Sequence, residues 1–557
     1  MTAPADIPAA GHRPPRRTPT GLFAGLAWTA AALCLMPMIA VALAALFGGT
    51  DTVAHLWDTV LPRYLRTTLA LVALVAAGTL TIGTGAAWLV TMTRFPGVRA
   101  FEVALVLPLA FPAYVLAYAY THLLDHPGAV QNGLRAITGW GPRDYWFPEI
   151  RSLGGAAAML ILVLYPYVYL LARAAFLRQG AATAMAARTL GRSIWGTFLS
   201  VSVPMARPAI AAGVLLAVME TIADFGTVAY FGVQTFATGI YASWFAMADR
   251  AAAAQLALGL LAFALLLAVL ERVQRGDARY SETARGHRPL APLRLTGWRA
   301  AAAWAACAVP VLLGALLPAV VLALMARESG QDLLSPRYLG FVRNSVTLAA
   351  IAAVLTVAAA IAIGFHRRLS GGRGAAAASH IARLGYAVPG GVIAVGLLVP
   401  FAAFDNALDA FMRARFGLST GLLVTGSIWL LVGAYMIRFL AAALGAWDGG
   451  QATVPRNMEA AARSLGQTPL GTLRRVYLPI LRPSLLTALL IVFVDVMKEL
   501  PATLILRPFN FDTLAVQAYR LAADERLEGA AVPSLVIVAV GLLPVILICR
   551  QVGRRSA

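Results

Sequence analysis

The sequence has 557 residues, of which 60% are hydrophobic and only 13% are charged. Soluble domains carry about 25% charged residues, so this composition excludes a soluble globular protein and indicates a protein embedded in a membrane. The formal net charge of +20 does not indicate nucleic-acid binding. The basic residues are spread between apolar runs along the whole chain, and almost no soluble mass is left to hold a basic domain.

Apolar runs long enough to cross a bilayer, which takes roughly 20 residues, recur about twelve times along the chain. The runs are continuous rather than alternating, so they predict helices and not the strands of a barrel. We therefore expect an all-α integral membrane protein. The expected spans are 21–47, 67–93, 101–124, 155–177, 209–232, 253–271, 300–326, 345–365, 384–404, 421–446, 484–506 and 531–549.

Arginine clusters precede the first span and follow every even-numbered span. Examples are Arg16 and Arg17 before the first span, Arg367 and Arg368 after the eighth, and Arg554 after the last. Loops on the cytoplasmic side of a membrane carry such an excess of basic residues. We therefore expect both termini in the cytoplasm of a multi-pass protein.

The chain contains an internal repeat. The segment AARTLGRSIWGTFLSVSVPMARP (186–208) aligns without a gap with AARSLGQTPLGTLRRVYLPILRP (461–483), at an offset of 275 residues. The repeat predicts two parallel six-helix units related by an axis along the membrane normal, an arrangement that commonly encloses a transport path. The expected organisation is a cytoplasmic tail (1–20), a first unit (21–272), a cytoplasmic linker (273–298), a second unit (299–551) and a C-terminal tail (552–557).

Each repeated segment is a polar stretch between the fourth and fifth spans of its unit. Helix-forming residues lead to a glycine, and a proline then opens the next span, which predicts a short helix, a left-handed or flexible glycine turn and a second short helix. An amphipathic helix lying at the lipid interface is the simpler alternative for one such stretch. The shared residues are Ala186, Ala187, Gly191 and Pro204 in the first copy, and Ala461, Ala462, Gly466 and Pro479 in the second.

This pattern resembles the cytoplasmic EAA loop of permease subunits of binding-protein-dependent ABC importers, in which Glu-Ala-Ala is followed by a glycine and later by Leu-Pro. The sequence departs from it at the glutamate, because Met185 and Ala460 stand there and Glu459 is displaced by one residue. In that family the loop is a coupling helix that docks on the ATP-binding subunit. The resemblance implies the type I ABC permease fold, two copies of an ATP-binding subunit and location in the bacterial inner membrane.

The segments 219–245 and 493–519 are similar to the corresponding stretches of fused ferric-iron permeases. That similarity implies Fe(III) as cargo and a periplasmic ferric-binding protein as partner, with permeases for thiamine, polyamines or oxyanions as alternatives. Lys498 is the only lysine, and it lies within a span, so the chain cannot supply the lysine of a phosphate-binding loop. We expect the chain to be no enzyme and to hold no cofactor, with ATP and Mg²⁺ on the partner ATPase.

Four carboxylates lie inside predicted spans, where burial is costly and indicates function. Glu220 and Asp224 are four residues apart, as are Asp495 and Glu499 in the repeat, so each pair is expected on one helix face. Carboxylate oxygens suit a hard cation such as Fe(III), which favours a substrate path lined by these groups. The alternative is internal pairing with Lys498, Arg250 or Arg507. The phenols of Tyr114, Tyr118, Tyr165 and Tyr167 are further candidate ligands, although packing is the commoner role of such aromatic residues.

A secondary transporter built from two six-span halves also fits this topology, but it needs no duplicated docking loop. The outer loops are expected to receive the loaded binding protein. Candidate contacts there are Arg507, Arg520, Arg526, Asp512, Asp524 and Glu528.

Overall fold

The computed structural model describes residues 21–179, 189–275, 293–332 and 334–554. Ala186, Ala187, the N-terminal tail and most of the linker lie outside these residues. Helices dominate both halves, as expected from the continuous apolar runs. The elements of the first half are α1 (Gly21–Phe47), α2 (Thr50–Thr59), α3 (Leu61–Met92), β1 (Thr93–Arg94), α4 (Val98–Ala104), η1 (Leu107–Ala110), α5 (Ala113–Leu124), α6 (Ala129–Thr138), α7 (Leu153–Arg178), α9 (Ile194–Thr197), η2 (Phe198–Ser202), α10 (Val203–Ala223), α11 (Gly226–Tyr230), α12 (Phe236–Tyr241), η3 (Ala242–Ala246) and α13 (Arg250–Arg275).

The second half repeats this order from its second long helix onward. Its elements are β2 (Leu293–Arg294), α14 (Gly297–Val311), η4 (Leu312–Leu316), α15 (Leu317–Glu328), α16 (Pro336–Ser370), α17 (Arg373–Leu384), η5 (Gly385–Ala387), α18 (Gly390–Phe416), α19 (Ile428–Gln451), α20 (Arg456–Ser464), α21 (Pro469–Thr472), η6 (Leu473–Tyr477), α22 (Leu478–Met497), α23 (Pro501–Leu506), α24 (Leu514–Ala523) and α25 (Leu527–Arg554).

Among the described residues, eleven helices are long and apolar enough to span a membrane, or twelve if one bent pair is counted as a span. This confirms the expected class of all-α membrane protein. The bent pair is the span expected at 101–124, where the helix axis turns by 92° between Val98–Ala110 and Ala113–Thr138. Pro112 stands at the bend with extended backbone, and proline removes a helix donor and disfavours helix before it.

Two other expected spans are shorter than the sequence indicates. The span expected at 209–232 ends as α10 at Ala223, and the span expected at 484–506 ends as α22 at Met497. The short helix α11 follows α10, and the short helix α23 follows α22. The expectation of one continuous helix was wrong in both places. The sequence stays apolar across each break, although the backbone leaves the helix there and a polar side chain caps the short helix that follows.

The internal repeat is visible in the backbone as well as in the sequence. The π-helical turns η2 and η6 occupy positions 275 residues apart, immediately before Pro204 and Pro479. Proline has no N–H to donate, and the backbone N–H of the residue before each proline reaches back five residues, from Val203 to Phe198 and from Leu478 to Leu473. Both fifth long helices thus enter the bundle through the same local distortion.

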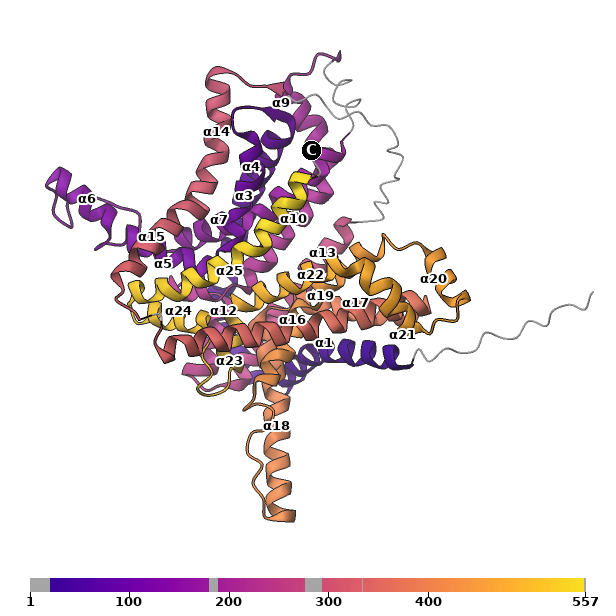
Figure 1. The fold of residues 1–557 in the computed structure, drawn as a ribbon. Coiled ribbons are helices and arrows are strands. Elements are labelled where there is room, and N and C mark those ends of the chain that lie inside the picture. The colour runs from indigo at the N-terminus through magenta and orange to yellow at the C-terminus, as the bar shows by residue number, and fades with distance from the viewer. Residues whose placement is uncertain (1–20, 180–188, 276–292, 333, 555–557) are drawn as a thin grey trace, which may run out of the picture.

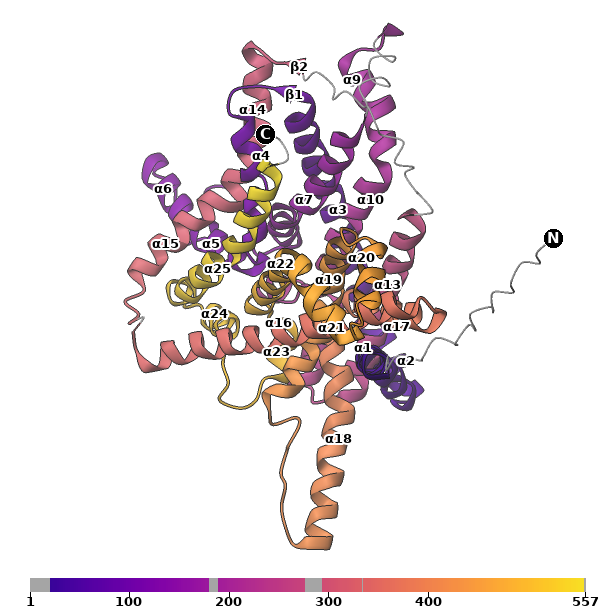
Figure 2. The same ribbon diagram turned by 45° about the vertical axis from the view of Figure 1, so that its right-hand side comes forward.

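The first helix of each half packs against the other half as well as its own. Helix α1 lies against α16, α17 and α18 of the second half and α13 of the first, while α14, η4 and α15 lie against α3, α5 and α7 of the first half and α25 of the second (Figure 1). The approach of α1 is close, because a Cβ added at Gly396 would lie 2.3 Å from the carbonyl oxygen of Pro37. The short parallel pair β1–β2 joins the end of α3 to the segment before α14 (Figure 2).

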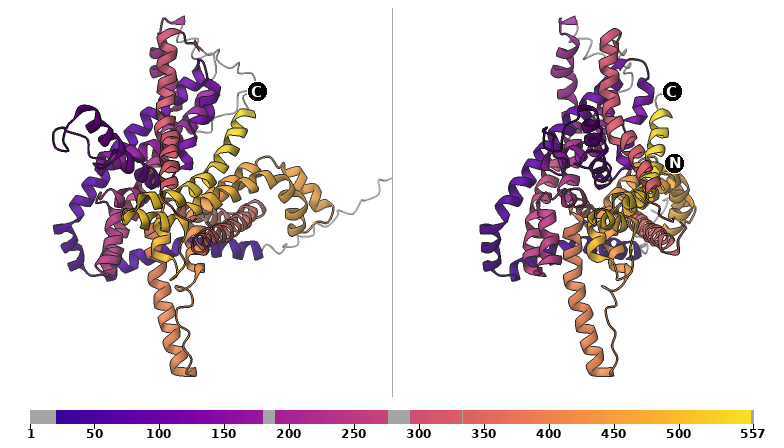
Figure 3. Two further views of the ribbon diagram at one scale, coloured as in Figure 1. Left: turned by 60° about the vertical axis from the view of Figure 1, so that its left-hand side comes forward. Right: turned by 90° about the vertical axis from the view of Figure 1, so that its left-hand side faces the viewer.

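Successive long helices run in opposite directions, so the connections between them alternate between two faces of the molecule. We call the ends at 92–98, 189–194, 294–297, 370–373 and 451–472 the loop face, and the ends at 47–50, 125–152, 246–250, 328–336, 417–427 and 507–527 the far face. Figure 1 shows the loop-face ends of the first half near the C-terminus and those of the second half around α20 and α21. The end of α18 extends well beyond the rest of the molecule in all views (Figure 3).

Candidate functional site

A cavity of about 150 Å³ lies where the two halves meet, and all four expected carboxylates line it. Glu220 and Asp224 come from the end of α10, and Asp495 and Glu499 come from the end of α22. The structure therefore brings the two repeat-related pairs to one place. The cavity is also lined by Tyr114, Val163, Tyr167, Ala223, Phe225, Tyr386, Arg438, Phe439, Lys498 and Pro501.

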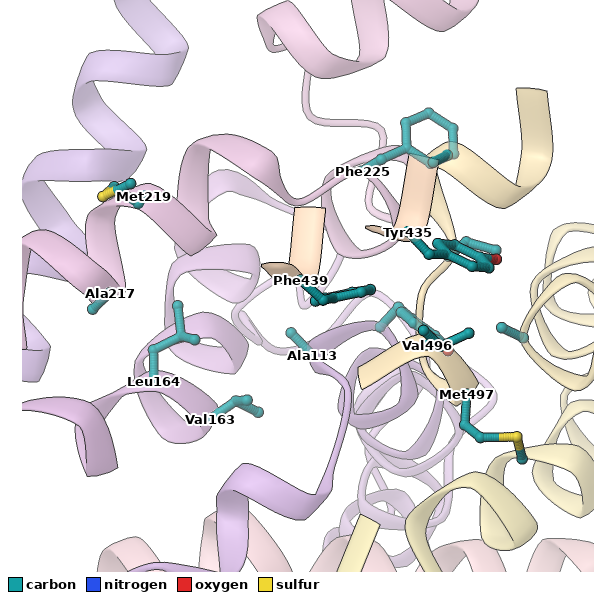
Figure 4. Close-up of a cluster of buried hydrophobic side chains, with 14 of the residues drawn as sticks. Ala113, Val163, Leu164, Ala217, Met219, Phe225, Tyr435, Phe439, Val496 and Met497 are labelled. Carbon is teal, nitrogen blue, oxygen red and sulfur yellow. The ribbon is translucent and has the colours of Figure 1, made fainter. Parts of the chain in front are cut away.

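Figure 4 shows a cluster of buried hydrophobic side chains from both halves, some of which line this cavity. Ala113, Val163 and Leu164 come from the first half, and Phe439 comes from α19 of the second; all four line the cavity. A charge in such an apolar frame is poorly solvated, so electrostatic interactions across the cavity are stronger than they would be in water.

Asp224 and Glu499 cap the short helices that follow them. Asp224 accepts hydrogen bonds from the backbone N–H groups of Thr227 (3.1 Å) and Val228 (3.2 Å) and from the Thr227 hydroxyl (2.9 Å). Glu499 accepts from the backbone N–H of Ala502 (2.8 Å) and from both donors of Thr503 (3.0 and 2.6 Å). Both residues stand after the end of the preceding helix, so the expectation of a shared helix face with Glu220 and Asp495 was wrong. These carboxylates satisfy helix N-termini.

Glu220 and Asp495 have cationic partners instead. Lys498 Nζ lies 2.9 Å from Asp495 Oδ1, which confirms that Lys498 pairs internally with an acidic residue. Glu220 has partners in the opposite half: the Tyr386 hydroxyl donates to its Oε1 at 3.2 Å, and Arg438 Nη2 lies 3.7 Å from its Oε2. Glu220 therefore links the two halves across the cavity.

The partners of Glu220, Arg438 and Tyr386, were not among the residues expected from the sequence; Arg438 is the more readily recognised of the two. It lies in the middle of α19, in the run YMIRFL inside an expected span. An arginine within a membrane helix is costly and indicates function, so this position alone could have identified it. The arginines considered instead do not reach the cavity: Arg507 pairs with Asp512, and Arg250 begins α13 at the far face.

The cavity carries a formal excess of two negative charges, because four carboxylates face two cationic side chains. An excess of this sign attracts cations and disfavours anions. Within the described part of the chain, no group of three or more His, Cys, Asp or Glu side chains is placed to hold a metal ion. The arrangement is thus an acidic chamber without a preformed metal cage.

A second cavity of about 730 Å³ adjoins the first on the side of the loop face. Five residues line both cavities and form the boundary between them: Leu109, Tyr167, Tyr386, Asp495 and Lys498. Toward the far face, the Phe225 and Tyr241 rings stack with centroids 3.7 Å apart, and the Tyr241 hydroxyl donates to the carbonyl of Pro501 in the other half. The acidic cavity therefore adjoins a larger cavity, and one of the two stacked rings, Phe225, belongs to its lining.

The four candidate tyrosines divide into two groups. Tyr114 and Tyr167 line the acidic cavity, and the Tyr114 hydroxyl donates to the carbonyl of Lys498 at 3.3 Å. Tyr118 and Tyr165 are fully buried outside it, where they pack against other side chains.

The second polar loop has the local structure expected from its sequence. Helix α20 ends in a left-handed turn at Gly466, whose φ is 77°, and the N–H of Gln467 bonds to the carbonyl of Ala462 (3.0 Å). That bond and the one from Gly466 N–H to the Arg463 carbonyl (2.9 Å) form a Schellman motif. In the first loop Gly191 has the same left-handed conformation, with a φ of 83°.

Glu459 points inward from α20. Its side chain is 9% exposed and accepts hydrogen bonds from Arg368 Nε (3.2 Å), the Tyr477 hydroxyl (3.0 Å) and Arg463. It anchors the loop on α16 and η6, and so it is not part of the outward surface. Ala461 is exposed and Ala462 is buried, at 6%.

Repeat-related leucines project from both loops. Leu190 is 84% exposed and Leu465 is 79% exposed, each immediately before its left-handed glycine. Met458 and Leu470 extend the exposed apolar surface around Leu465. An exposed leucine therefore occupies the same repeat position in both loops.

The far face carries a polar pocket of about 540 Å³ between the start of α16 and α24. Arg520, Arg526 and Asp524 of the expected outer contacts line it, together with Arg337. Arg507 is partly buried and, like Arg520, forms an ion pair with Asp512.

Comparisons with known proteins agree with this architecture. Residues 355–556 match the family of binding-protein-dependent transport system inner membrane components. Across 96% of this chain and 99% of the relative, the sequence is 26% identical to the Fe(3+)-transport system permease protein FbpB 2 of Haemophilus influenzae. It is 25% identical to the ferric transport system permease protein FbpB of Actinobacillus pleuropneumoniae, over 83% of this chain and 67% of the relative. It is also 29% identical to the molybdenum transport system permease protein ModB of Azotobacter vinelandii, over 36% of this chain and 89% of the relative.

Proposed function

We propose that the chain is the permease subunit of an ATP-driven importer of ferric iron, because residues 355–556 match the family of binding-protein-dependent transport system inner membrane components and a ferric permease is similar over nearly the whole chain. The observation that carries the choice of cargo is the acidic cavity between the halves, with its excess of two negative charges. Carboxylate and phenol oxygens suit Fe(III), whereas an oxyanion such as molybdate is repelled by the same groups. Two relatives that are similar over most of the chain are named as ferric permeases, which supports the same cargo.

In this proposal the loop face lies in the cytoplasm and the far face in the periplasm. The arginine distribution supports that orientation, since basic loops stay on the cytoplasmic side. A periplasmic ferric-binding protein delivers cargo to the far face, where Arg337, Arg520 and Arg526 line the polar pocket. The wider cavity toward the loop face corresponds to an inward-facing state.

Energy comes from two ATP-binding subunits that dock on the two polar loops. Lys498 pairs with Asp495 inside the cavity, so the sole lysine of the chain serves no nucleotide site. Leu190 and Leu465 supply the apolar contacts, and Gly191 and Gly466 allow the turns that present them. ATP-driven approach of the two subunits moves the loops together and switches the halves between inward- and outward-facing states, with Glu220 at their junction.

The test is uptake of radioactive iron by liposomes that contain this chain and its ATP-binding subunit. Iron-loaded binding protein is supplied on the side of the membrane to which the far face is exposed. Uptake should require ATP hydrolysis and should persist when a protonophore collapses the proton gradient. Loss of uptake with the gradient and indifference to ATP would instead identify a secondary transporter. Faster uptake of molybdate than of iron would show that the cargo is an oxyanion.

A further inference from the structure

The ion pair between Asp495 and Lys498 stands at the passage between the two cavities. Both residues line the acidic cavity of about 150 Å³ and the larger cavity of about 730 Å³. Lys498 Nζ lies 2.9 Å from Asp495 Oδ1, and the two side chains are 29% and 28% exposed, respectively. Their exposed surface therefore faces the cavities, and an ion that moves from one cavity to the other passes beside this pair.

The Asp495 carboxylate is held by a side chain rather than by the backbone. Asp224 and Glu499 accept hydrogen bonds from backbone N–H groups of the short helices that they cap, and those donors are fixed in position. Among the described residues, Lys498 is the sole hydrogen-bond or ion-pair partner of the Asp495 side chain. Lysine carries a compact charge on a flexible four-carbon stem, so its ammonium can leave Asp495 without a change of the backbone.

The internal repeat shows that this lysine is an addition to the cavity. At the offset of 275 residues, Asp495 corresponds to Glu220, and Lys498 corresponds to Ala223, which also lines the acidic cavity. The first half thus keeps the carboxylate without a neighbouring cation, and Glu220 takes its partners from the opposite half. A carboxylate at this position does not require a lysine three residues later, so folding alone does not explain Lys498.

An unpaired carboxylate at this passage would hold a cationic cargo too firmly for release. Coulomb attraction is proportional to charge, so a trivalent ion is attracted about three times as strongly as a monovalent one. Carboxylate oxygen is also a preferred ligand of hard cations. An importer has to release its cargo in every cycle, and the ammonium of Lys498 occupies the place beside Asp495 Oδ1 that a cation would otherwise take.

We propose that Lys498 is a tethered competitor of the cargo, whose ammonium exchanges with the metal ion on the Asp495 carboxylate and so speeds release from the acidic cavity into the larger one. This inference rests on the proposed function, because it assumes that a cation is imported through these cavities. An entering cation displaces the ammonium, and the returning ammonium displaces the cation toward the loop face. One cation replaces another at the carboxylate, and no proton or covalent bond is transferred.

The first measurement is the binding of terbium(III) to the purified full-length chain in detergent. Terbium is a hard trivalent ion whose luminescence is sensitised by nearby aromatic rings, and Tyr167 and Tyr386 line both cavities. Lys498→Gln should raise the affinity for terbium about ten-fold, as expected if the ammonium leaves Asp495 free about one-tenth of the time. The double variant Lys498→Gln, Asp495→Asn should lose this gain. Lys498→Arg can make two bonds to Asp495 and should lower the affinity below the native value.

The matched control is Arg299→Gln, which removes one positive charge at an exposed position of α14 that lines neither cavity. It should leave the affinity for terbium unchanged. The unfolding midpoint in detergent reports whether each variant is folded. An unchanged affinity in folded Lys498→Gln, or a gain that persists in the double variant, overturns the inference. If Lys498→Gln does not fold, Lys498→Arg decides, and an affinity at or above the native value overturns the inference.

The second measurement is the release of cargo by the reconstituted importer. After one round of ATP hydrolysis, the native importer should leave labelled iron free inside the liposomes. Lys498→Gln should keep several-fold more of the iron on the protein when the liposomes are dissolved, and equal retention by the two would contradict a role in release. If the native importer takes up no iron with ATP, the proposed function itself fails, whereas terbium binding still decides whether Lys498 competes with a cation for Asp495.

Discussion

Arg151 and Glu525 are 374 residues apart in the chain and form a two-armed ion pair that joins the two halves at the far face. Their Nη1–Oε1 and Nη2–Oε2 distances are 2.5 and 2.7 Å. Arg151 also contacts Asp125 of its own half at 3.1 Å, and its guanidinium lies 5.3 Å from the centre of the Tyr230 ring. The pair therefore bridges the two halves at the far face, and in the proposed transport cycle it would hold that face closed.

Arg151→Ala should weaken that closure and favour the outward-facing state. The Glu525 side chain is 60% exposed, so the solvent-screened pair is worth about 1 kcal/mol, or roughly a five-fold shift in the equilibrium. ATP hydrolysis by the reconstituted importer without binding protein should rise by about that factor. The exchange Arg151→Glu with Glu525→Arg should reverse most of the rise, and an unchanged basal rate in the single variant would show that the pair does not hold the closed state.

The same pair predicts a dependence on pH. The hydrogen bonds from Arg151 lower the pKa of Glu525 below its ordinary value of 4.5. A carboxylate with a lowered pKa stabilises the paired state above its ordinary pKa, and this stabilisation is lost as pH falls through the lowered value. Closure of the far face, followed by the distance between spin labels at Ala129 and Ala523, should therefore be constant from pH 7 to about 5 and should loosen at lower pH. In Glu525→Gln the distance should be the same at pH 7 and at the low pH that loosens the native protein; a further change of that variant at low pH would assign the effect to another group.

The contact predicted for the ATP-binding subunit can be tested at the exposed leucines. Leu465→Glu places a charge in an apolar contact, and the desolvation cost of an unpaired charge should weaken binding at least ten-fold, roughly 1.4 kcal/mol. Co-purification of the ATP-binding subunit with the double variant Leu190→Glu, Leu465→Glu should fall below that of either single variant. Leu418→Glu, at a leucine that is 60% exposed on the far face, is the control and should retain the partner.

The sequence was sufficient to predict the helical class, the repeat and a left-handed or flexible turn at both loop glycines, because these depend on local composition and spacing. It was not sufficient to predict the breaks after Ala223 and Met497. Apolar composition runs through both breaks, and the signal was an acidic residue followed by a helix start, such as Glu499 before Pro501. The cavity needed the fold as well, since Glu220 meets Arg438 and Tyr386 only when the halves pack together.

The packing of α1 against helices of the second half could not be predicted from the sequence either, because no local pattern specifies which half α1 contacts. Gly396→Val should separate α1 from α18, since a Cβ there would lie 2.3 Å from the Pro37 carbonyl. Overpacking of this kind costs about 1–3 kcal/mol, so the thermal unfolding midpoint in detergent should fall by several degrees. Gly433→Val in α19, where a Cβ meets no atom within 4 Å, should change the midpoint much less. Equal midpoints for the two variants would contradict the close contact.

The four cavity carboxylates should separate into two classes by their response to neutral substitutions. Glu220→Gln and Asp495→Asn remove charges that face the cavity and should together lower iron uptake at least about ten-fold, since they abolish the excess of negative charge. Asp224→Ala and Glu499→Ala should mainly lower stability, by about 1 kcal/mol each, because each removes the cap of a short helix. Asp224→Asn and Glu499→Gln keep an acceptor oxygen and should recover most of that stability. The measurements are uptake in liposomes and the unfolding midpoint in detergent for each variant. Normal uptake by the Glu220→Gln, Asp495→Asn double variant would remove both residues from the path of the cargo and would leave the cavity a purely structural junction between the halves.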